Sequence, residues 1–356
     1  MSAATPTAVG PRGRRGYAGT VSAATDATRP AVSRTDRVVG RLTPRLVLGV
    51  AIANLVAQAV IILTGGVVRL TASGLGCSTW PECEPGEFTP VFHEAATIHP
   101  FIEFGNRTLT GVLVVIALAL AVLVLFSPAT RARTVRFRVL GLIPLVGVLV
   151  QAVIGGITVL VDLHPAVVGG HFVISAALVW GSAVLVARLR EGDGPRTPTL
   201  DAPGWRAAVI RRTPVVYAVL TAIVVVLGVI TTGAGPHSGD SEVGYRFPVD
   251  PALTARFHAL SVWAFVAGLV VVLLAIHGRG VQRVTTTAPG ARTPRVRRAW
   301  WILLAVTLSQ GLIGYVQYFT GLPIGLVAIH LFGSAGLVAA TTFAVLSLRT
   351  RPSSTP

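Results

Sequence analysis

Eight apolar segments constrain this chain more than any other feature of its sequence. Each is close to the roughly 20 apolar residues that a helix needs to cross the hydrocarbon core of a bilayer. Only 12% of the residues are charged and the mean hydropathy is +0.71, as in integral membrane proteins. We expect an all-α integral membrane protein with eight transmembrane helices, at about residues 46–68, 101–126, 139–161, 168–187, 214–233, 255–276, 299–319 and 326–348.

Arginine alternates between the two sides of this predicted array. The N-terminal tail holds eight Arg, the three loops 127–138, 188–213 and 277–298 hold four, six and six, and the remaining loops hold four. Positive loops stay in the cytoplasm. We therefore expect a multi-pass protein of the cell membrane, with both termini inside. Because the Arg residues lie between apolar segments, the net charge of +16 reflects orientation in a lipid bilayer, and we expect no nucleic-acid partner.

An internal repeat divides the chain into two halves. Gln151 and Gly155 are followed by His171, twenty residues after the Gln, and Gln310 and Gly314 are followed by His330 at the same spacing. With four spans per half, both halves have the same orientation. The sequence thus predicts two tandem four-helix bundles, related by a pseudo-twofold axis along the membrane normal.

The predicted domain organisation follows from this repeat. We expect a disordered, Arg-rich cytoplasmic tail and two four-helix halves separated by a cytoplasmic linker. We place the tail at 1–45, the halves at 46–190 and 214–348, the linker at 191–213 and a second cytoplasmic tail at 349–356.

Three histidines lie at one predicted depth, a few residues inside the outer ends of their spans: His171, His258 and His330. A polar side chain at that depth is costly unless it is paired or bound. A single such His is most often a helix-to-helix hydrogen bond. Three at matching depth, two of them in a repeat, instead favour metal or heme ligands, because a neutral imidazole is the usual heme-iron ligand.

Glu103 is the only carboxylate inside a predicted span. Glu103, Asn106 and Arg107 are spaced to share one helix face. Two interpretations are open. Glu103 and Arg107 form a structural ion pair, or Glu103 is a carboxylate that takes up protons in a low-dielectric pocket.

Cys77 and Cys83 are the only cysteines, and both fall in a predicted outer loop. Outer loops face an oxidising compartment, and Pro81 and nearby glycines permit a tight turn. We expect a Cys77–Cys83 disulfide, of either structural or redox function. Two thiolates are too few for a metal site of their own.

Several of these motifs, taken together and in order, resemble the heme A synthase family over about residues 46–348. They are Thr64-Gly-Gly-Val-Val-Arg69 with Gly76-Cys77-Ser-Thr-Trp80-Pro81, Glu103-Phe-Gly-Asn106-Arg107, Gln151…Gly155-Gly156…His171, Arg256-Phe-His258, and Gln310…Gly314…His330.

The resemblance implies an oxidoreductase that converts the C8 methyl of heme o to a formyl, giving heme a for terminal oxidases, with oxygen from water. It implies a heme b cofactor between His258 and His330, His171 at the iron of the substrate heme, and Glu103 in catalysis. The expected partners are heme o synthase (a protoheme farnesyltransferase) and terminal oxidase assembly. The oligomeric state is open, a homo-oligomer included.

One position departs from the family pattern: many relatives have His where this chain has Asn106, and a carboxamide is a poor iron ligand. Substrate iron is then held by His171 alone or with water, or His99 replaces the missing ligand. Arg69, Arg107 and Arg256, at the outer level, are candidates to contact heme propionates, with lipid headgroups as the alternative.

Two rival functions use the same framework. A b-type membrane cytochrome that passes electrons, for instance from quinol, would need a second heme with two His ligands, which Asn106 disfavours. A transporter is disfavoured because the spans lack paired Gly/Pro interruptions and midplane charges.

Overall fold

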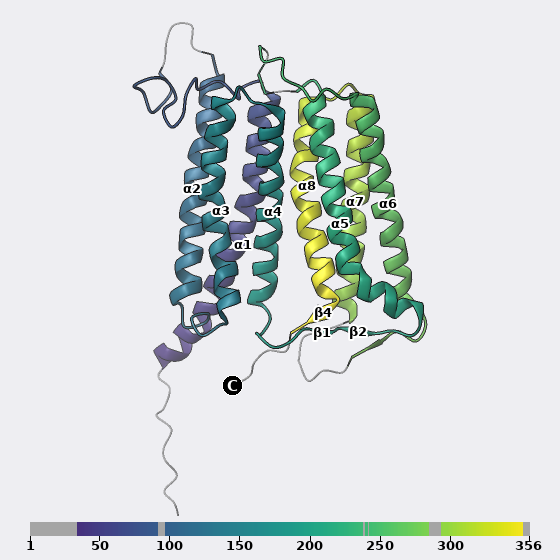
Figure 1. Ribbon diagram of the computed structural model, residues 1–356. Coiled ribbons are helices and arrows are strands. Elements are labelled where there is room, and N and C mark those ends of the chain that lie inside the picture. Colours follow the sequence, from purple (N-terminus) through teal and green to yellow (C-terminus); the bar gives the residue numbers. More distant parts are fainter. Residues whose placement is uncertain (1–33, 92–96, 238, 241, 285–292, 352–356) are drawn as a thin grey trace, which may run out of the picture. The chain divides into compact units, whose positions relative to one another are not determined.

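Eight long helices make up most of the described part of the chain. The computed structural model describes residues 34–91, 97–237, 239–240, 242–284 and 293–351. Residues up to Val39 belong to a separate unit, and the description below concerns the unit that begins at Gly40 (Figure 1). Most of the predicted tail at 1–45, and residues 352–356 of the second tail, lie outside the described residues.

All eight helices are long and apolar enough to cross a membrane, which confirms the predicted all-α membrane fold. The helices are α1 (Arg34–Leu70), α2 (His99–Phe126), α3 (Val135–Leu160), α4 (Pro165–Leu189), α5 (Trp205–Ala234), α6 (Pro251–His277), α7 (Thr293–Phe319) and α8 (Ile324–Ser347).

Proline marks the outer starts of several helices. Pro165 and Pro251 occupy the first turns of α4 and α6, where a missing backbone N–H is tolerated. Asp250 caps α6, since its carboxylate accepts a hydrogen bond of 2.8 Å from the Ala252 N–H. These residues end the loops at the end of the unit opposite the Arg-rich end and fix where the two helices begin.

The helices begin earlier than predicted at the Arg-rich end. α5 starts at Trp205 rather than at residue 214, so it takes up part of the predicted linker at 191–213. Hydropathy detects only the part of a helix that lies in hydrocarbon, and Arg can extend a helix into the headgroup region with its charge in water. The helical ends are therefore more polar than the spans.

The unit contains two groups of four helices, α1–α4 and α5–α8 (Figure 1). In the second group, Tyr217 packs edge-to-face against Phe265 and Trp300, with ring centroids 4.9 and 5.2 Å apart. Helices α4, α5 and α8 join the groups, and Ile62 of α1 adds to the buried contact between α4 and α8. The same neighbours, α2 with α3 and α6 with α7, recur in both groups. The pseudo-twofold axis stays a prediction.

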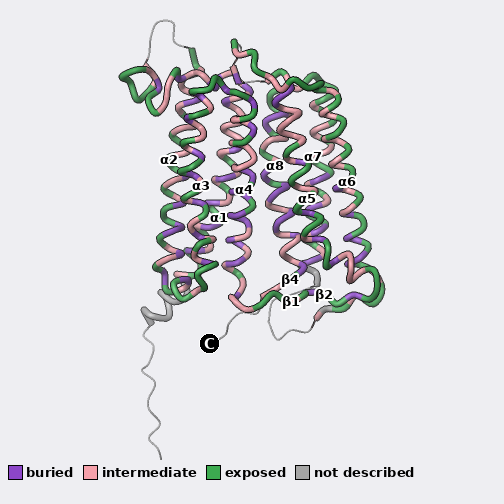
Figure 2. The backbone as a smooth tube through the Cα atoms, in the orientation of Figure 1, coloured by how far each residue is buried: buried purple, intermediate pink, exposed green. Residues whose placement is uncertain are grey.

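Buried and exposed positions alternate along each helix (Figure 2). Large apolar side chains such as Val115, Leu118 and Val122 of α2 are exposed. In water this would be costly, whereas in a bilayer these faces contact lipid.

Short antiparallel strand pairs organise the Arg-rich end. β1 (Thr197–Pro198) pairs with β4 (Arg349–Thr350), and β2 (Leu200–Asp201) pairs with β3 (Gln282–Arg283). The segment between α4 and α5 is thereby tied to the loop before α7 and to the chain that follows α8.

Candidate functional site

A cavity of about 770 Å³ is lined by residues of both helix groups. Its volume is at the large end of the roughly 300–1,000 Å³ found for ligand and cofactor sites. Most of its lining is apolar, with a few polar side chains placed among it. The polar side chains that the sequence singled out and that line it are Arg69, Glu103, Asn106, Arg107, Gln151 and His171 from the first half, and His258, Gln310 and His330 from the second.

His258 of α6 and His330 of α8 face each other in this cavity. Their ring centroids are 6.4 Å apart and their planes are at 82°. Glycines on the preceding helices make room for both rings. A Cβ built at Gly228 would lie 3.2 Å from the His258 ring, and one at Gly314 would lie 3.4 Å from that of His330. Buried Nδ1 atoms of both rings have no hydrogen-bond partner among the described residues.

The spacing of this His pair fits a metal held between two imidazoles. A metal–nitrogen bond of roughly 2 Å on each side would place the two ring centroids about 6 Å apart. Among the described residues, no group of three or more His, Cys, Asp or Glu side chains could hold a metal. The other ligands would have to come with the metal, and a heme supplies them.

His171 of α4 has similar surroundings but no facing imidazole. A Cβ at Gly155 would lie 3.6 Å from its ring, and its buried Nδ1 has no partner among the described residues. Asn106 of α2 also lines the cavity, and its Oδ1 accepts a hydrogen bond of 2.7 Å from the Thr64 hydroxyl. The first-half site therefore offers one imidazole and one oriented carboxamide.

The repeated glutamines hold the helices that carry the histidines. Gln151 donates from Nε2 to the His171 carbonyl at 2.8 Å and to the Ser175 hydroxyl at 2.6 Å. In the second half, the Gln310 amide packs closely against Gly333 of α8. The glutamines thus position the His-bearing helices from the neighbouring helix.

Glu103 is buried and engages both a cation and the backbone. Its Oε2 accepts a hydrogen bond of 2.8 Å from the Cys77 N–H, and its Oε1 lies 2.6 Å from Nη2 of Arg107. Arg107 also donates to the carbonyls of Thr79 and Glu82, at 3.0 and 3.1 Å. The ion pair, one of the two interpretations that the sequence left open, is present, and Arg107 also fastens the 71–98 loop to α2.

That outer loop is closed by the predicted disulfide and covers the outer end of the cavity. Cys77 and Cys83 are bonded and fully buried. Between them, Trp80 lines the cavity and packs so closely on Gly156 of α3 that a Cβ there would overlap its ring. The disulfide loop therefore places an aromatic lid over the first-half site.

Other predicted residues are placed differently. Arg69 lines the cavity, but its Nε donates to the His237 carbonyl at 2.7 Å and so ties the two halves together. Arg256 is exposed and lies outside the lining residues. His99 is also outside the lining, and its Nδ1 is 2.8 Å from the Ser73 hydroxyl.

Many residues of the site were not singled out by the sequence analysis, and three of them matter most here. Gln58 of α1 is 1% exposed and lines the cavity, and its Nε2 has no partner among the described residues. The other two are Trp80 and Gly228. A Gln within an apolar run was a detectable signal for Gln58, whereas Gly228 stands outside the Gln/Gly/His repeat and carries no such signal.

Comparison with known proteins gives one consistent family. Residues 48–342 match the model of a family described as cytochrome oxidase assembly protein. A heme A synthase of Bacillus licheniformis is 24% identical over 80% of this chain and 90% of its own length. A heme A synthase of Bacillus pumilus is 33% identical over 39% of this chain, a match that spans 43% of that protein. A heme A synthase of Exiguobacterium sibiricum is 32% identical over 38% of this chain and 43% of its own length.

Proposed function

Because this chain belongs to the heme A synthase family of cytochrome oxidase assembly proteins, we propose that it acts in heme a biosynthesis by oxidising heme o. The proposed reaction converts the C8 methyl to a formyl with oxygen from water, and the four electrons and four protons that this removes require an external electron acceptor, to which the electrons would pass one at a time. The observation that carries the proposal is the facing pair His258 and His330, in one cavity with a separate, unpaired His171.

His258 and His330 are proposed to hold a heme b. Their separation suits two axial ligands, and the glycines behind the rings leave the imidazoles close to the neighbouring helices. When bound, heme b supplies one-electron redox chemistry. The contribution of the chain is to fix both rings in orientation and to surround the group with apolar residues.

The first half is proposed to receive heme o. His171 would bind the substrate iron, while Asn106, held by Thr64, would offer a carboxamide, which is a poor iron ligand. Trp80 and the disulfide loop would exclude water from the outer end. Glu103 is proposed to accept protons from the carbon that is oxidised, a role that suits a buried carboxylate lining the same cavity.

Pigment analysis tests this proposal. The full chain is produced in membranes that contain heme o, purified, and its hemes are extracted and separated by chromatography. We expect heme b together with heme o or heme a, and ¹⁸O from labelled water in the new formyl group, measured before exchange.

The same experiment separates the rival functions. Heme b alone, with no conversion of heme o, would identify an electron-transferring b-type cytochrome. Protein without any heme would exclude both heme-based proposals and return the transporter to consideration.

A further inference from the structure

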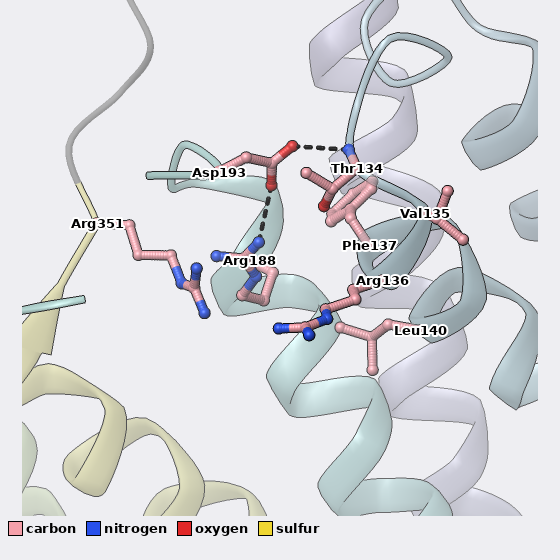
Figure 3. A pocket seen from close by; sticks show the side chains of 8 residues that line it. All are labelled: Thr134, Val135, Arg136, Phe137, Leu140, Arg188, Asp193 and Arg351. Carbon is pink, nitrogen blue, oxygen red and sulfur yellow. Dashed lines mark hydrogen bonds and ion pairs between the residues drawn. The ribbon is translucent and has the colours of Figure 1, made fainter. Parts of the chain in front are cut away.

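A second cavity, of about 360 Å³, lies at the Arg-rich end of the unit, and none of its lining residues lines the His-bearing cavity. Three guanidinium groups from separate segments approach one space there (Figure 3). Arg136 comes from the first turn of α3, Arg188 from the last turn of α4, and Arg351 from the chain just after β4. The rest of the lining is Thr134, Val135, Phe137, Leu140 and Asp193.

Asp193, the only acidic residue of this lining, is already engaged by its neighbours. Its carboxylate accepts two hydrogen bonds from Arg133, at 2.8 and 2.9 Å, one of 2.9 Å from the Thr134 N–H and one of 2.8 Å from Arg188. The hydrogen bonds from Arg133 are the main cause that lowers the pKa of Asp193 to about 2. Asp193 therefore has little capacity left to neutralise Arg136 and Arg351.

Arg136 and Arg351 retain donors and charge, whereas Arg188 is paired with Asp193 and Glu191. Arg351 donates a hydrogen bond of 2.9 Å from Nη1 to the Gly194 carbonyl, but its buried Nε has no partner among the described residues. Arg136 is exposed and forms no ion pair within the described part of the chain. Arg133 and Arg188 are balanced by Asp193 and Glu191, so Arg136 and Arg351 leave a formal charge of +2, which an anion would balance.

The opposite side of the cavity is apolar and lies at the start of a membrane span. Val135, 72% exposed, and Leu140 belong to α3, which enters the membrane here. The ligand that fits both sides carries a phosphate for the guanidinium groups and hydrocarbon for α3. Guanidinium recognises phosphate through paired N–H donors, and basic pockets between membrane helices are suited to anionic headgroups.

We propose that this cavity binds the headgroup of an anionic phospholipid from the inner leaflet. Arg136 and Arg188 belong to the first half, whereas Arg351 follows α8 of the second and is held in place by the β1–β4 pair. The bound lipid bridges the two halves at the end opposite the disulfide loop.

Lipid titration followed by native mass spectrometry tests this site. The full-length protein, delipidated in detergent, is titrated with phosphatidylglycerol, with phosphatidylcholine, or with sodium phosphate. We expect tighter binding of phosphatidylglycerol than of phosphatidylcholine. Arg136→Gln and Arg351→Gln should each weaken phosphatidylglycerol binding by about five-fold, because an Arg near an anionic lipid surface contributes about 1 kcal/mol. Arg188 is left intact because it also holds Asp193.

Arg212→Gln is the matched control. It removes one exposed Arg of α5 at the same, Arg-rich end of the unit, but Arg212 does not line the cavity. Its affinity should equal that of the unaltered protein. Equal affinities for Arg136→Gln, Arg351→Gln and Arg212→Gln, with helicity retained, would overturn the proposal. Sodium phosphate that displaces the lipid at equal concentration would also overturn it, by assigning the cavity to soluble phosphate.

Discussion

The first-half and second-half His sites share a scaffold and differ in what faces the histidine. In the second half, His330 faces His258, with ring centroids 6.4 Å apart. In the first half, His171 shares the cavity with Asn106, whose carboxamide is hydrogen-bonded to Thr64. A pair of imidazoles suits a group that stays bound, whereas one imidazole leaves a coordination position open.

The residues around the two His sites also differ. The first-half site has a buried carboxylate, Glu103, and a disulfide-closed loop that lays Trp80 over its outer end. The comparison teaches that similar His-bearing helices can differ in a few side chains and one loop, and under the proposed function these differences separate a retained heme from a heme that is converted.

Removing a histidine should break the comparison most completely. His258→Ala or His330→Ala should abolish the low-spin heme b spectrum, because one axial ligand of a six-coordinate iron is lost. His171→Ala should keep that spectrum and eliminate heme a formation. His277→Ala, at the inner end of α6, is the control, since His277 lies outside the cavity lining. Loss of heme b from His171→Ala would reverse the assignment of the two halves.

Glu103 should contribute more than its ion pair. Glu103→Gln cannot accept a proton, so the rate of heme a formation should fall by about 10²–10⁴-fold, with heme b retained and heme o or a hydroxylated intermediate accumulating. Arg107→Gln breaks the same ion pair and frees the loop, yet leaves the carboxylate. It should lose less activity than Glu103→Gln. Equal losses in the two variants would show that Glu103 serves only to hold the loop.

Asn106→His should make the first half resemble the second. An imidazole in place of the carboxamide adds a ligand on the open side of the substrate iron, and Thr64 loses its partner. With heme o bound, electron paramagnetic resonance should show a second low-spin species. Activity should still require Glu103, so a double variant with Glu103→Gln should be as inactive as Glu103→Gln alone.

The glycines behind the rings should respond in order of closeness. Gly228→Ala places a Cβ 3.2 Å from the His258 ring and should shift its orientation, and with it the heme b absorption and midpoint potential. Gly155→Ala places one at an ordinary 3.6 Å from His171 and should be tolerated. Gly170→Ala, which meets nothing within 4 Å, controls for helix propensity. A larger effect from Gly155→Ala would contradict this ranking.

The smallest effect should be that of pH on the stability contributed by the ion pairs of Asp193 with Arg133 and Arg188. Because its pKa is lowered from 3.8 to about 2 in the folded protein, Asp193 contributes stability that is present above pH 3.8 and lost as pH falls towards 2. Thermal unfolding should therefore show a constant difference between Asp193→Asn and the unaltered protein from pH 5 to 8. Any pH dependence of heme a formation in that range would then arise from groups other than Asp193. A stability difference that changes between pH 5 and 8 would contradict the prediction.

The sequence by itself determined the membrane class, the eight spans and the duplication of the His-bearing helices. Apolar length and a twenty-residue spacing are local patterns, so they can be read without knowing what packs against what. The Cys77–Cys83 disulfide was predicted for the same reason, and the Glu103–Arg107 ion pair was one of two interpretations left open, since both join residues close in sequence.

Only the tertiary structure decided which of these residues share a space. Trp80 meets Gly156, Gly228 meets His258, and the Glu103 carboxylate meets the Cys77 N–H, although no sequence spacing predicts these contacts. In the sequence, Arg136, Arg188 and Arg351 are part of the charge that predicts the orientation of the helices. In the structure, all three line one cavity. Contacts of this kind depend on how helices and loops far apart in the chain pack, and packing is set by the whole set of buried surfaces together.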